Sequence, residues 1–196
     1  MMKRILVVGG ANGIGLSIAT ELAKRDSCEK VYIVDKVAPD KEYLNSKMEY
    51  FEFDLTSDDY SIFDKFDDID TLMITAGFGR LALFKDISEE HITSSFAVNA
   101  VAPIRIIHHF MDKLQSNNDF YCGVMVSIAG FLSSPFFAVY GATKAALKIF
   151  IYSRPSTAAR HRGAPRQSAD RPSPPWAARC APRFRPQRPR NSSKFR

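Results

Sequence analysis

The sequence predicts an α/β protein built on a doubly wound parallel sheet, with helices on both faces in three α/β/α layers. The first observation is that short apolar runs alternate with longer amphipathic runs through residues 1–150. The second is that most of the short runs are almost continuously apolar, which is typical of parallel strands covered on both faces. This rhythm indicates an open sheet whose strands are joined by crossover helices.

Five strands and four helices are expected. Each predicted strand is an apolar run with turn or polar residues beside it, and each predicted helix is a longer amphipathic run. The strands are Arg4–Val8, Val31–Asp35, Met48–Phe53, Thr71–Thr75 and Tyr121–Ser127. The helices are Gly13–Arg25, Asp58–Phe66, Glu89–Leu114 and Ala138–Ile151.

The longest predicted helix, residues 89–114, has clear signals. Ser88 can cap its first turn, and Glu89 suits the positive end of the helix dipole. Asn99 is the only polar member of its inward-facing stripe, which reads Ile92, Phe96, Asn99, Pro103, Ile106, Phe110. Pro103 is expected to kink the helix just after Asn99.

The composition changes near residue 150 and divides the chain into two predicted segments. Residues 1–150 carry 15 lysines and arginines against 20 acids, whereas residues 151–196 carry 12 against one and hold 8 of the 11 prolines. We predict a folded domain over residues 1–152, incomplete at its C-terminus, and a disordered Arg/Pro-rich tail over residues 153–196. Too little apolar mass remains in the tail to offset the entropy of ordering it.

The tail has two interpretations. Dense arginines with interleaved aromatic residues are typical of nucleic-acid binding. We favour the other interpretation, a non-native sequence produced by a shifted reading frame, so that the folded domain is truncated after its last helix.

Cysteine usage and hydropathy bear on location. The three cysteines are scattered without metal-ligand spacing, which fits reduced thiols and predicts no metal site. No apolar run approaches the ~18 residues of a membrane span. The chain is therefore expected to be soluble and cytoplasmic, without a membrane partner.

A glycine-rich segment, Gly-Gly-Ala-Asn-Gly-Ile-Gly over residues 9–15, follows the first predicted strand and opens the first helix. Such glycines let the backbone approach a pyrophosphate at the helix N-terminus, although a plain glycine-rich turn has the same composition. Asp35 ends the second predicted strand about twenty residues later, where an acid suits a free ribose diol and repels a 2′-phosphate. The pair predicts NAD(H) in preference to NADP(H), unless Asp35 merely caps the next turn.

A second group of residues predicts proton-transfer chemistry. Tyr140 and Lys144 stand four residues apart on the last predicted helix and so share one face. A positive charge beside a phenol favours the phenolate, and a hydroxyl such as that of Ser127 can hold a substrate oxygen against it. The alternative is an exposed aromatic residue and a solvated lysine.

Residues 1–150 resemble the short-chain dehydrogenases/reductases, a family with a Rossmann-type fold. Seven landmarks carry the resemblance, in the family's order: Gly9/Gly13/Gly15, Asp35, Asp54 in Phe53-Asp54-Leu55-Thr56, Ala76-Gly77, Asn99 in Val98-Asn99-Ala100, Ser127, and Tyr140-x-x-x-Lys144. Val8 and Thr75 depart from the pattern, because the family usually has Thr and Asn there. Thr75 keeps a hydroxyl, so we expect weakened rather than lost packing.

The resemblance implies a role for each matching residue. Those expected to bind the cofactor are Gly9, Asn12, Gly13, Ile14 and Gly15 at the pyrophosphate, Asp35 at the adenosine ribose, Asp54 and Leu55 beside the adenine, and Ala76 and Gly77 beneath the cofactor. Those expected to be catalytic are Tyr140 as general acid/base, Lys144 activating it and holding the nicotinamide ribose, Ser127 orienting the substrate oxygen, and Asn99 anchoring a water in the proton relay.

These roles imply an NAD(H)-dependent oxidoreductase that interconverts an alcohol and a ketone on a small-molecule substrate. Phe78, Phe131, Phe136 and Phe137 suggest that this substrate is apolar. Two alternatives stay open: a catalytically impaired dinucleotide-binding fragment of such an enzyme, and a nucleic-acid-binding protein acting through its tail. The family also implies a dimer or tetramer paired through the helices that contain Asn99 and Tyr140, which the truncation puts in doubt.

Overall fold

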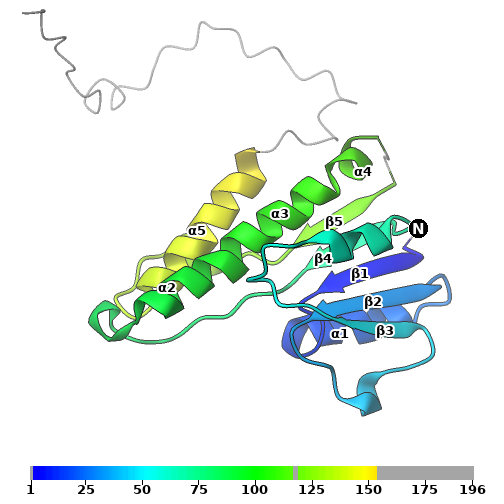
Figure 1. Cartoon of the computed structure of the whole chain (residues 1–196), viewed down its shortest axis with the longest axis horizontal. Helices are drawn as coiled ribbons and strands as arrows, with labels where there is room; N and C mark the ends of the chain where they lie inside the picture. Colours follow the sequence, from blue (N-terminus) through cyan, green and yellow to red (C-terminus); the bar gives the residue numbers. More distant parts are fainter. Residues whose placement is uncertain (1, 117–118, 154–196) are drawn as a thin grey trace, which may run out of the picture. The chain divides into compact units, whose positions relative to one another are not determined.

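Five parallel strands form a twisted sheet at the centre of the fold (Figure 1). The computed structural model describes residues 2–116 and 119–153. The strands are β1 (Arg4–Val8), β2 (Lys30–Asp35), β3 (Met48–Glu52), β4 (Thr71–Ile74) and β5 (Tyr121–Val124), in the order β3-β2-β1-β4-β5. Every strand pairing is parallel. The strand order reverses beside β1, which places a crevice between the loops that follow β1 and β4.

The two faces of the sheet are covered by different helices. On one face, Ile5 and Val7 of β1 pack in a buried cluster with Ala19 and Leu22 of α1 (Gly13–Ala23). On the other, the alternate residues of β1 pack with Phe63 and with α3 (Ala102–His109). Because side chains alternate along a strand, apolar residues at every position of β1 are required to build both layers. The predicted three-layer fold is confirmed (Figure 1).

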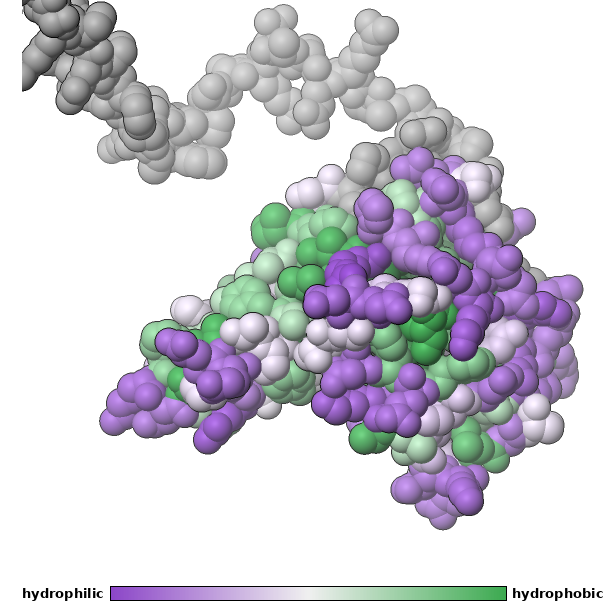
Figure 2. Space-filling model, viewed as in Figure 1, coloured by the Kyte–Doolittle hydropathy of each residue, from purple (hydrophilic) through white to green (hydrophobic). Residues whose placement is uncertain are grey.

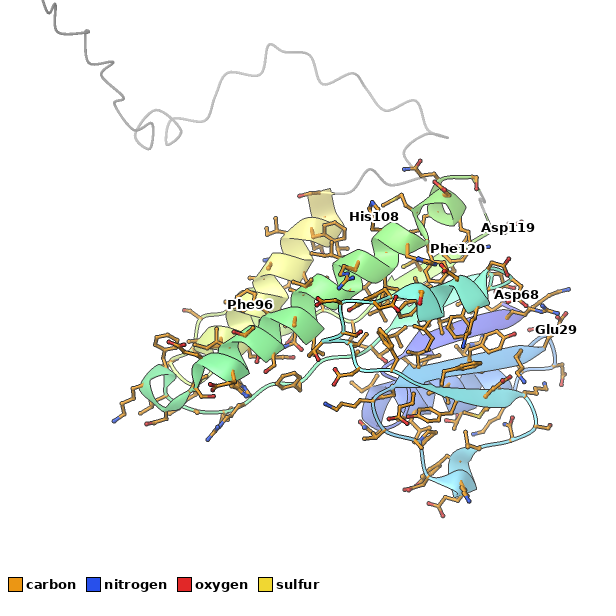
Figure 3. The ribbon with its side chains drawn as sticks, in the orientation of Figure 1. Glu29, Asp68, Phe96, His108, Asp119 and Phe120 are labelled. Carbon is orange, nitrogen blue, oxygen red and sulfur yellow. The ribbon has the colours of Figure 1, made fainter. Side chains whose placement is uncertain are left out.

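The remaining helical elements are one long helix and several short ones. The last helix, α5 (Ala138–Ser153), contributes Phe150 and Ile151 to the same cluster as α3. The short elements are η1 (Lys41–Tyr43), η2 (Ser61–Phe66), η3 (Phe84–Asp86), α4 (Met111–Ser116) and η5 (Ile128–Gly130). In Figure 3, Phe120 precedes β5, and its ring stacks on that of Phe110 at the end of α3.

The predicted helix over residues 89–114 does not form as a single α-helix. The structure has α2 (Glu89–Phe96), a π-helical turn η4 (Ala97–Val101), then α3 and α4. The departure from α-helical geometry falls at Ala97–Val101, around Asn99 and just before Pro103, close to where the kink was expected. Phe96 is also exposed and not part of the inward stripe.

The predicted helix over residues 58–66 is also wrong, because only a 3-10 helix forms over Ser61–Phe66. The preceding side chains bond to nearby backbone instead. Ser57 Oγ accepts a hydrogen bond from Asp59 N–H (3.2 Å), and Asp59 Oδ1 accepts one from Ser61 N–H (2.8 Å). Such local bonds compete with the first turn of an α-helix.

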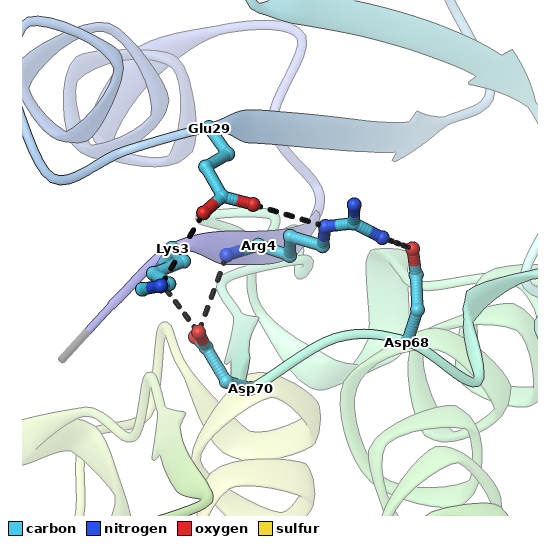
Figure 4. A network of polar contacts seen from close by, with 5 residues as sticks. All are labelled: Lys3, Arg4, Glu29, Asp68 and Asp70. Carbon is cyan, nitrogen blue, oxygen red and sulfur yellow. Dashed lines mark hydrogen bonds and ion pairs between the residues drawn. The ribbon is translucent and has the colours of Figure 1, made fainter.

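A network of charged groups joins the amino ends of the strands (Figure 4). Arg4 pairs with Glu29 (3.3 Å) and with Asp68, while the Asp70 carboxylate accepts hydrogen bonds from the backbone N–H groups of Lys3 and Arg4. Glu29 and Asp68 are partly exposed, so each pair contributes little to stability. The network links β1 to the segments before β2 and β4, at the edge opposite the strands' carboxyl ends.

The described residues stop with α5. The predicted tail, residues 153–196, lies outside them apart from Ser153, which ends α5. Within residues 2–116 and 119–153, every helix is too short or too polar to cross a membrane. Over the same residues, no three His, Cys, Asp or Glu side chains are grouped to hold a metal ion.

Candidate functional site

A cleft of about 570 Å³ opens at the carboxyl ends of the strands. It is bounded by the segments that follow β1, β2, β3 and β4, which a parallel sheet brings to one edge. Ten of the twelve residues predicted to bind the cofactor line it: Gly9, Asn12, Gly13, Ile14, Gly15, Asp35, Asp54, Leu55, Ala76 and Gly77. The other two, Tyr140 and Lys144, do not. These ten residues lie up to 68 positions apart in the sequence, and the fold brings them to one concave surface.

Three of the four glycines in the segment after β1, Gly9, Gly13 and Gly15, differ in what a side chain would meet. Gly9 has φ +82°, and a Cβ on it would lie 2.4 Å from the Cα of Ala76. A Cβ on Gly15 would lie 2.0 Å from the carbonyl oxygen of Gly9, so this glycine lets α1 pack under the turn. Gly13 has φ +53°, but its Cβ would meet nothing within 4 Å. Packing therefore excludes a side chain at Gly9 and at Gly15, whereas a side chain at Gly13 would face open space.

Thr75 ties the turn to the loop after β4. Its hydroxyl lies 2.9 Å from the carbonyl oxygen of Val8 and 3.0 Å from that of Gly9. The N–H groups of Thr75 and Ala76 also donate to Val8. The expectation that the Thr75 hydroxyl makes local hydrogen bonds is confirmed.

The amino end of α1 faces the cleft. Asn12 is its N-cap residue, with extended backbone angles, yet its side chain makes no capping hydrogen bond. The first N–H groups of a helix have no partner within the helix. Asn12, Gly13 and Ile14 are all exposed on the cleft wall, so this end of α1 presents donors and a positive dipole end to a ligand.

Asp35 is fixed at the end of β2. Its Oδ2 accepts a hydrogen bond from Ala11 N–H (3.0 Å), and its Oδ1 accepts one from Lys36 N–H (2.7 Å). Since each carboxylate oxygen has two acceptor positions, one on each oxygen is left for a pair of ligand hydroxyls.

Asp54 is held by two neighbours. Lys36 Nζ lies 2.7 Å from Asp54 Oδ2, while Thr56 donates its N–H (2.9 Å) and its hydroxyl (2.8 Å) to Oδ1. The Lys36 ammonium, followed by the Thr56 N–H, lowers the pKa of Asp54 from 3.8 to about 2. The side chain is therefore a fixed carboxylate at neutral pH.

Asn99 clamps the loop after β4 from inside the π-helical turn. It is fully buried, and its Oδ1 accepts from Phe78 N–H (2.9 Å) while its Nδ2 donates to Phe78 O (2.7 Å) and Thr143 Oγ1 (3.1 Å). Its side chain thus pairs with backbone as another peptide group would. A role in a water relay would fall to its main chain.

Lys144 and Tyr140 lie against the same loop. The Lys144 ammonium is buried, donates to Met125 O (3.3 Å), and lies 5.9 Å from the centre of the Tyr140 ring. Burial lowers the pKa of Lys144 below 10.5. A Cβ on Gly77 would come within 3.0 Å of Lys144 Nζ, and one on Gly79 within 2.8 Å of the Tyr140 ring. The structure therefore brings Tyr140, Lys144 and Asn99 together around Gly77–Gly79.

Ser127 lies on an adjoining segment. It follows β5 and caps η5, where its Oγ accepts from Ala129 N–H (3.2 Å). Next to it, a Cβ on Gly130 would lie 2.8 Å from the Lys144 backbone, so η5 packs directly on α5. Ser127 and Tyr140 do not themselves line the cleft wall, although Gly77 and Met125, which contact Lys144, do.

Several lining residues were not predicted. They are Lys36, Phe53, Thr56, Thr75, Ser94, Val98 and Met125, whereas Phe78 was expected to face the substrate and does line the cleft. Thr56 carries a readable signal, since Asp-x-Thr is typical of a side-chain turn. Val98 directly precedes Asn99, and Ser94 lies about one helical turn earlier. Nothing in the sequence indicates that this helical segment approaches the glycine turn.

An open parallel sheet with a glycine turn at the switch point and an acid after the second strand defines the Rossmann class of dinucleotide-binding folds. The family model "short chain dehydrogenase" matches residues 3–162. The chain therefore belongs to the short-chain dehydrogenase family.

Curated relatives agree with this assignment, and a solved structure shares the fold. The chain is 29% identical over 150 residues to the dehydrogenase RED2 of Cochliobolus heterostrophus, covering 73% of this chain and 56% of that one. It is 30% identical over 148 residues to the short-chain type dehydrogenase/reductase y4eK of Sinorhizobium fredii, covering 74% and 59%. A 3-oxoacyl-[acyl-carrier protein] reductase from Brucella melitensis in complex with NAD matches with TM-score 0.64 and 24% identity, over 77% and 66%. The chain spans little more than half the length of these curated relatives.

Proposed function

We propose that the protein is an NAD(H)-dependent oxidoreductase that interconverts an alcohol and a ketone, with Tyr140 as general acid/base. The observation that carries the proposal is the buried Lys144 ammonium, 5.9 Å from the Tyr140 ring, beside a loop that also walls the cleft. A nicotinamide cofactor supplies hydride chemistry when bound. The chain's own residues must bind it and move the proton.

The cleft residues fit a dinucleotide. The uncapped amino end of α1 and the open side of Gly13 suit a pyrophosphate, which needs N–H donors and close backbone approach. Asp35 has one free acceptor position on each oxygen, which suits the two hydroxyls of an unmodified ribose. Its negative charge would repel a 2′-phosphate, and this supports NAD(H) over NADP(H).

The catalytic residues fit proton transfer to a carbonyl oxygen. Tyr140 donates its phenolic proton to the developing alkoxide, and the Lys144 ammonium stabilises the phenolate that remains. Within residues 2–116 and 119–153, no carboxylate pairs with Lys144, so its charge is not neutralised there. Ser127 is the candidate for a second hydrogen bond to the substrate oxygen. Exposed Phe78 and Phe131 support an apolar substrate.

The first test compares Tyr140→Phe with Tyr152→Phe. Both tyrosines are on α5, but Tyr152 is 75% exposed near its end. With NADH and a panel of small ketones, Tyr140→Phe should lose at least ~100-fold in kcat while NADH still binds, because general acid–base catalysis typically contributes that much. Tyr152→Phe should behave as the wild type. Equal turnover by the two variants refutes the assignment.

A second candidate is dinucleotide binding without turnover. One observation favours this candidate. The cleft wall includes the ten predicted cofactor residues between Gly9 and Gly77, but it includes neither of the predicted catalytic residues Ser127 and Tyr140. Tight NADH binding with no oxidation of NADH by any ketone in the panel would support this candidate over the enzyme.

We also propose that the protein pairs with itself through α2, η4 and α5. On the face shown in Figure 2, hydrophobic residues gather over α5. Phe96, Val101, Ile149 and Tyr152 are exposed apolar side chains on these elements. Sedimentation of the full chain should give a dimer or larger assembly, and Ile149→Glu should shift it toward monomer. A monomer at all concentrations contradicts the pairing.

A further inference from the structure

Asn12 and Gly13 stand side by side on the wall of the cleft, where the chain enters α1. Both residues are exposed. Asparagine is one of the thermolabile residue types. It loses its side-chain amide when the backbone nitrogen of the next residue attacks Cγ, and this attack is fastest before a glycine, which has no Cβ to obstruct it. Whether the pair reacts therefore depends on how firmly the fold holds these two atoms.

The side chain of Asn12 is not held. It makes no capping hydrogen bond to α1, and nothing else in the part of the chain that the structure describes bonds to it. The other described asparagines differ in this respect. The side chain of Asn45 accepts a hydrogen bond from backbone two residues on, and both amide atoms of the buried Asn99 are bonded. Asn12 is thus the one whose Cγ can turn toward an attacking nitrogen.

The attacking nitrogen is free as well. Gly13 is the first residue of α1, so its N–H has no acceptor within the helix. Its surroundings are open, since even an added Cβ would meet nothing within 4 Å. Ring closure must turn the peptide bond between Asn12 and Gly13, whose carbonyl accepts a hydrogen bond from Leu16 N–H (3.1 Å). That bond belongs to the first turn of the helix, where helices fray.

We propose that Asn12–Gly13 is a site of deamidation and that the reaction abolishes cofactor binding. The Gly13 nitrogen gives up its proton and bonds to Asn12 Cγ. The bond from Cγ to the amide nitrogen breaks, and ammonia leaves with that proton. Water then opens the cyclic imide at either carbonyl, which gives aspartate or isoaspartate. Water is the only co-reactant.

Both products place a carboxylate where the cofactor would carry its pyrophosphate. The proposal therefore rests on dinucleotide binding in this cleft, as proposed above. Like charges at close range oppose association, and isoaspartate also lengthens the main chain by one methylene at the entrance to α1. An aspartate at the N-cap suits the helix itself, so binding should fall without a loss of stability. A bound pyrophosphate would occupy the first N–H groups of α1, so the cofactor should slow the reaction.

The test incubates the full chain for days in mildly alkaline buffer, with and without NADH, and follows deamidation by mass spectrometry after trypsin digestion. Asn12 lies in the peptide of residues 5–24, which has no other side-chain amide. Asn45, in the peptide of residues 42–47, is the matched control, because it is also exposed but is bonded and precedes a serine. Half of the first peptide should be deamidated before the second changes. NADH at about ten times its dissociation constant should slow the reaction roughly tenfold, because only the free chain reacts.

Fluorescence titration then measures NADH binding by the aged samples. The aged wild type and a fresh Asn12→Asp variant should bind at least roughly tenfold more weakly than the fresh wild type. Thermal unfolding of Asn12→Asp should occur no lower than that of the wild type. Asn12→Ser, which keeps a capping oxygen but has no amide to lose, should keep its own fresh affinity through the same incubation.

The possible results separate the proposal from the proposed function. No deamidation in the peptide of residues 5–24, or equal deamidation of the two peptides, overturns the proposal and leaves dinucleotide binding intact. A deamidated chain that binds NADH as tightly as the fresh one also overturns it, as does bound NADH that leaves the rate unchanged. If Asn12→Ser loses affinity as fast as the wild type, the loss has another cause and the proposal fails. A fresh wild type that binds no NADH refutes the proposed function and this proposal with it.

Discussion

Replacing single glycines of the turn after β1 should separate packing from ligand binding. Gly9 and Gly13 both have positive φ, +82° and +53°. An L-residue at such angles costs about 1–2 kcal/mol, and the loss of chain entropy in the unfolded state offsets about 0.4–1 kcal/mol of it. Gly13→Ala, which would meet nothing within 4 Å, should therefore lower the free energy of unfolding by only about 1 kcal/mol.

Gly9→Ala carries a further cost. Its Cβ would lie 2.4 Å from both the Cα and the N of Ala76 and 2.8 Å from its Cβ. Because two of these atoms are backbone, next to β4, relief requires moving one strand end away from another. Overpacking of this kind costs about 1–3 kcal/mol, so Gly9→Ala should be destabilised by about 3 kcal/mol, roughly 2 kcal/mol more than Gly13→Ala.

Urea unfolding followed by circular dichroism measures both free energies, and NADH titration of the same samples measures binding. Gly13→Ala should be the less affected variant in the unfolding assay and the more affected one in the binding assay. It should fold nearly as well as the wild type but bind NADH at least roughly tenfold more weakly. The reason is that its methyl group would project into the cleft where a pyrophosphate must approach. If Gly9→Ala and Gly13→Ala unfold within about 0.5 kcal/mol of each other, the contact argument is refuted.

Two further predictions follow from buried polar groups. Asn99→Ala should destabilise the fold by about 2 kcal/mol, measured by urea unfolding, since the backbone of Phe78 and the hydroxyl of Thr143 would lose their partner; an unchanged midpoint would contradict the clamp. Burial lowers the pKa of Lys144, so the unfolded chain binds more protons between that lowered value and 10.5, and wild-type stability should rise relative to Lys144→Met as pH increases through this window. Parallel stability profiles of the two proteins would show that Lys144 is not desolvated.

The features that could be predicted from sequence are those whose causes are local. Glycines that follow an apolar run, and Asp35 at the end of the next one, are adjacent to the strands that position them. Once the sheet is parallel, its carboxyl ends meet at one edge, and the ten cleft residues come together without further information. Tyr140 and Lys144 were likewise readable, because one helical turn joins them.

The features that could not be predicted depend on distant partners. The π-helical turn surrounds Asn99, whose side chain bonds to Phe78, 21 residues away, and to Thr143, 44 residues away. The stripe around Asn99 has normal helical spacing, so the sequence predicted a kinked α-helix there and not a π-helical turn. Tertiary hydrogen bonds accompany a widening that helical periodicity does not encode. Lys36 was missed for a similar reason, since its partner Asp54 lies on the neighbouring strand segment.

These distant contacts converge on one short loop. A side chain at Gly77 would be crowded, because Lys144 Nζ and Asn99 Oδ1 would lie 3.0 and 3.2 Å from its Cβ, and one at Gly79 would meet the Tyr140 ring at 2.8 Å. Phe78, between them, is held by both amide atoms of Asn99. The loop that walls the cleft is thus shaped by the same side chains that are proposed to move the proton. A change that shifts α5 must therefore alter the cleft as well, since Lys144 and Tyr140 contact its wall directly. Binding and proton transfer should accordingly fail together when packing between α5 and this loop is lost, and separately only when the phenolic oxygen alone is removed.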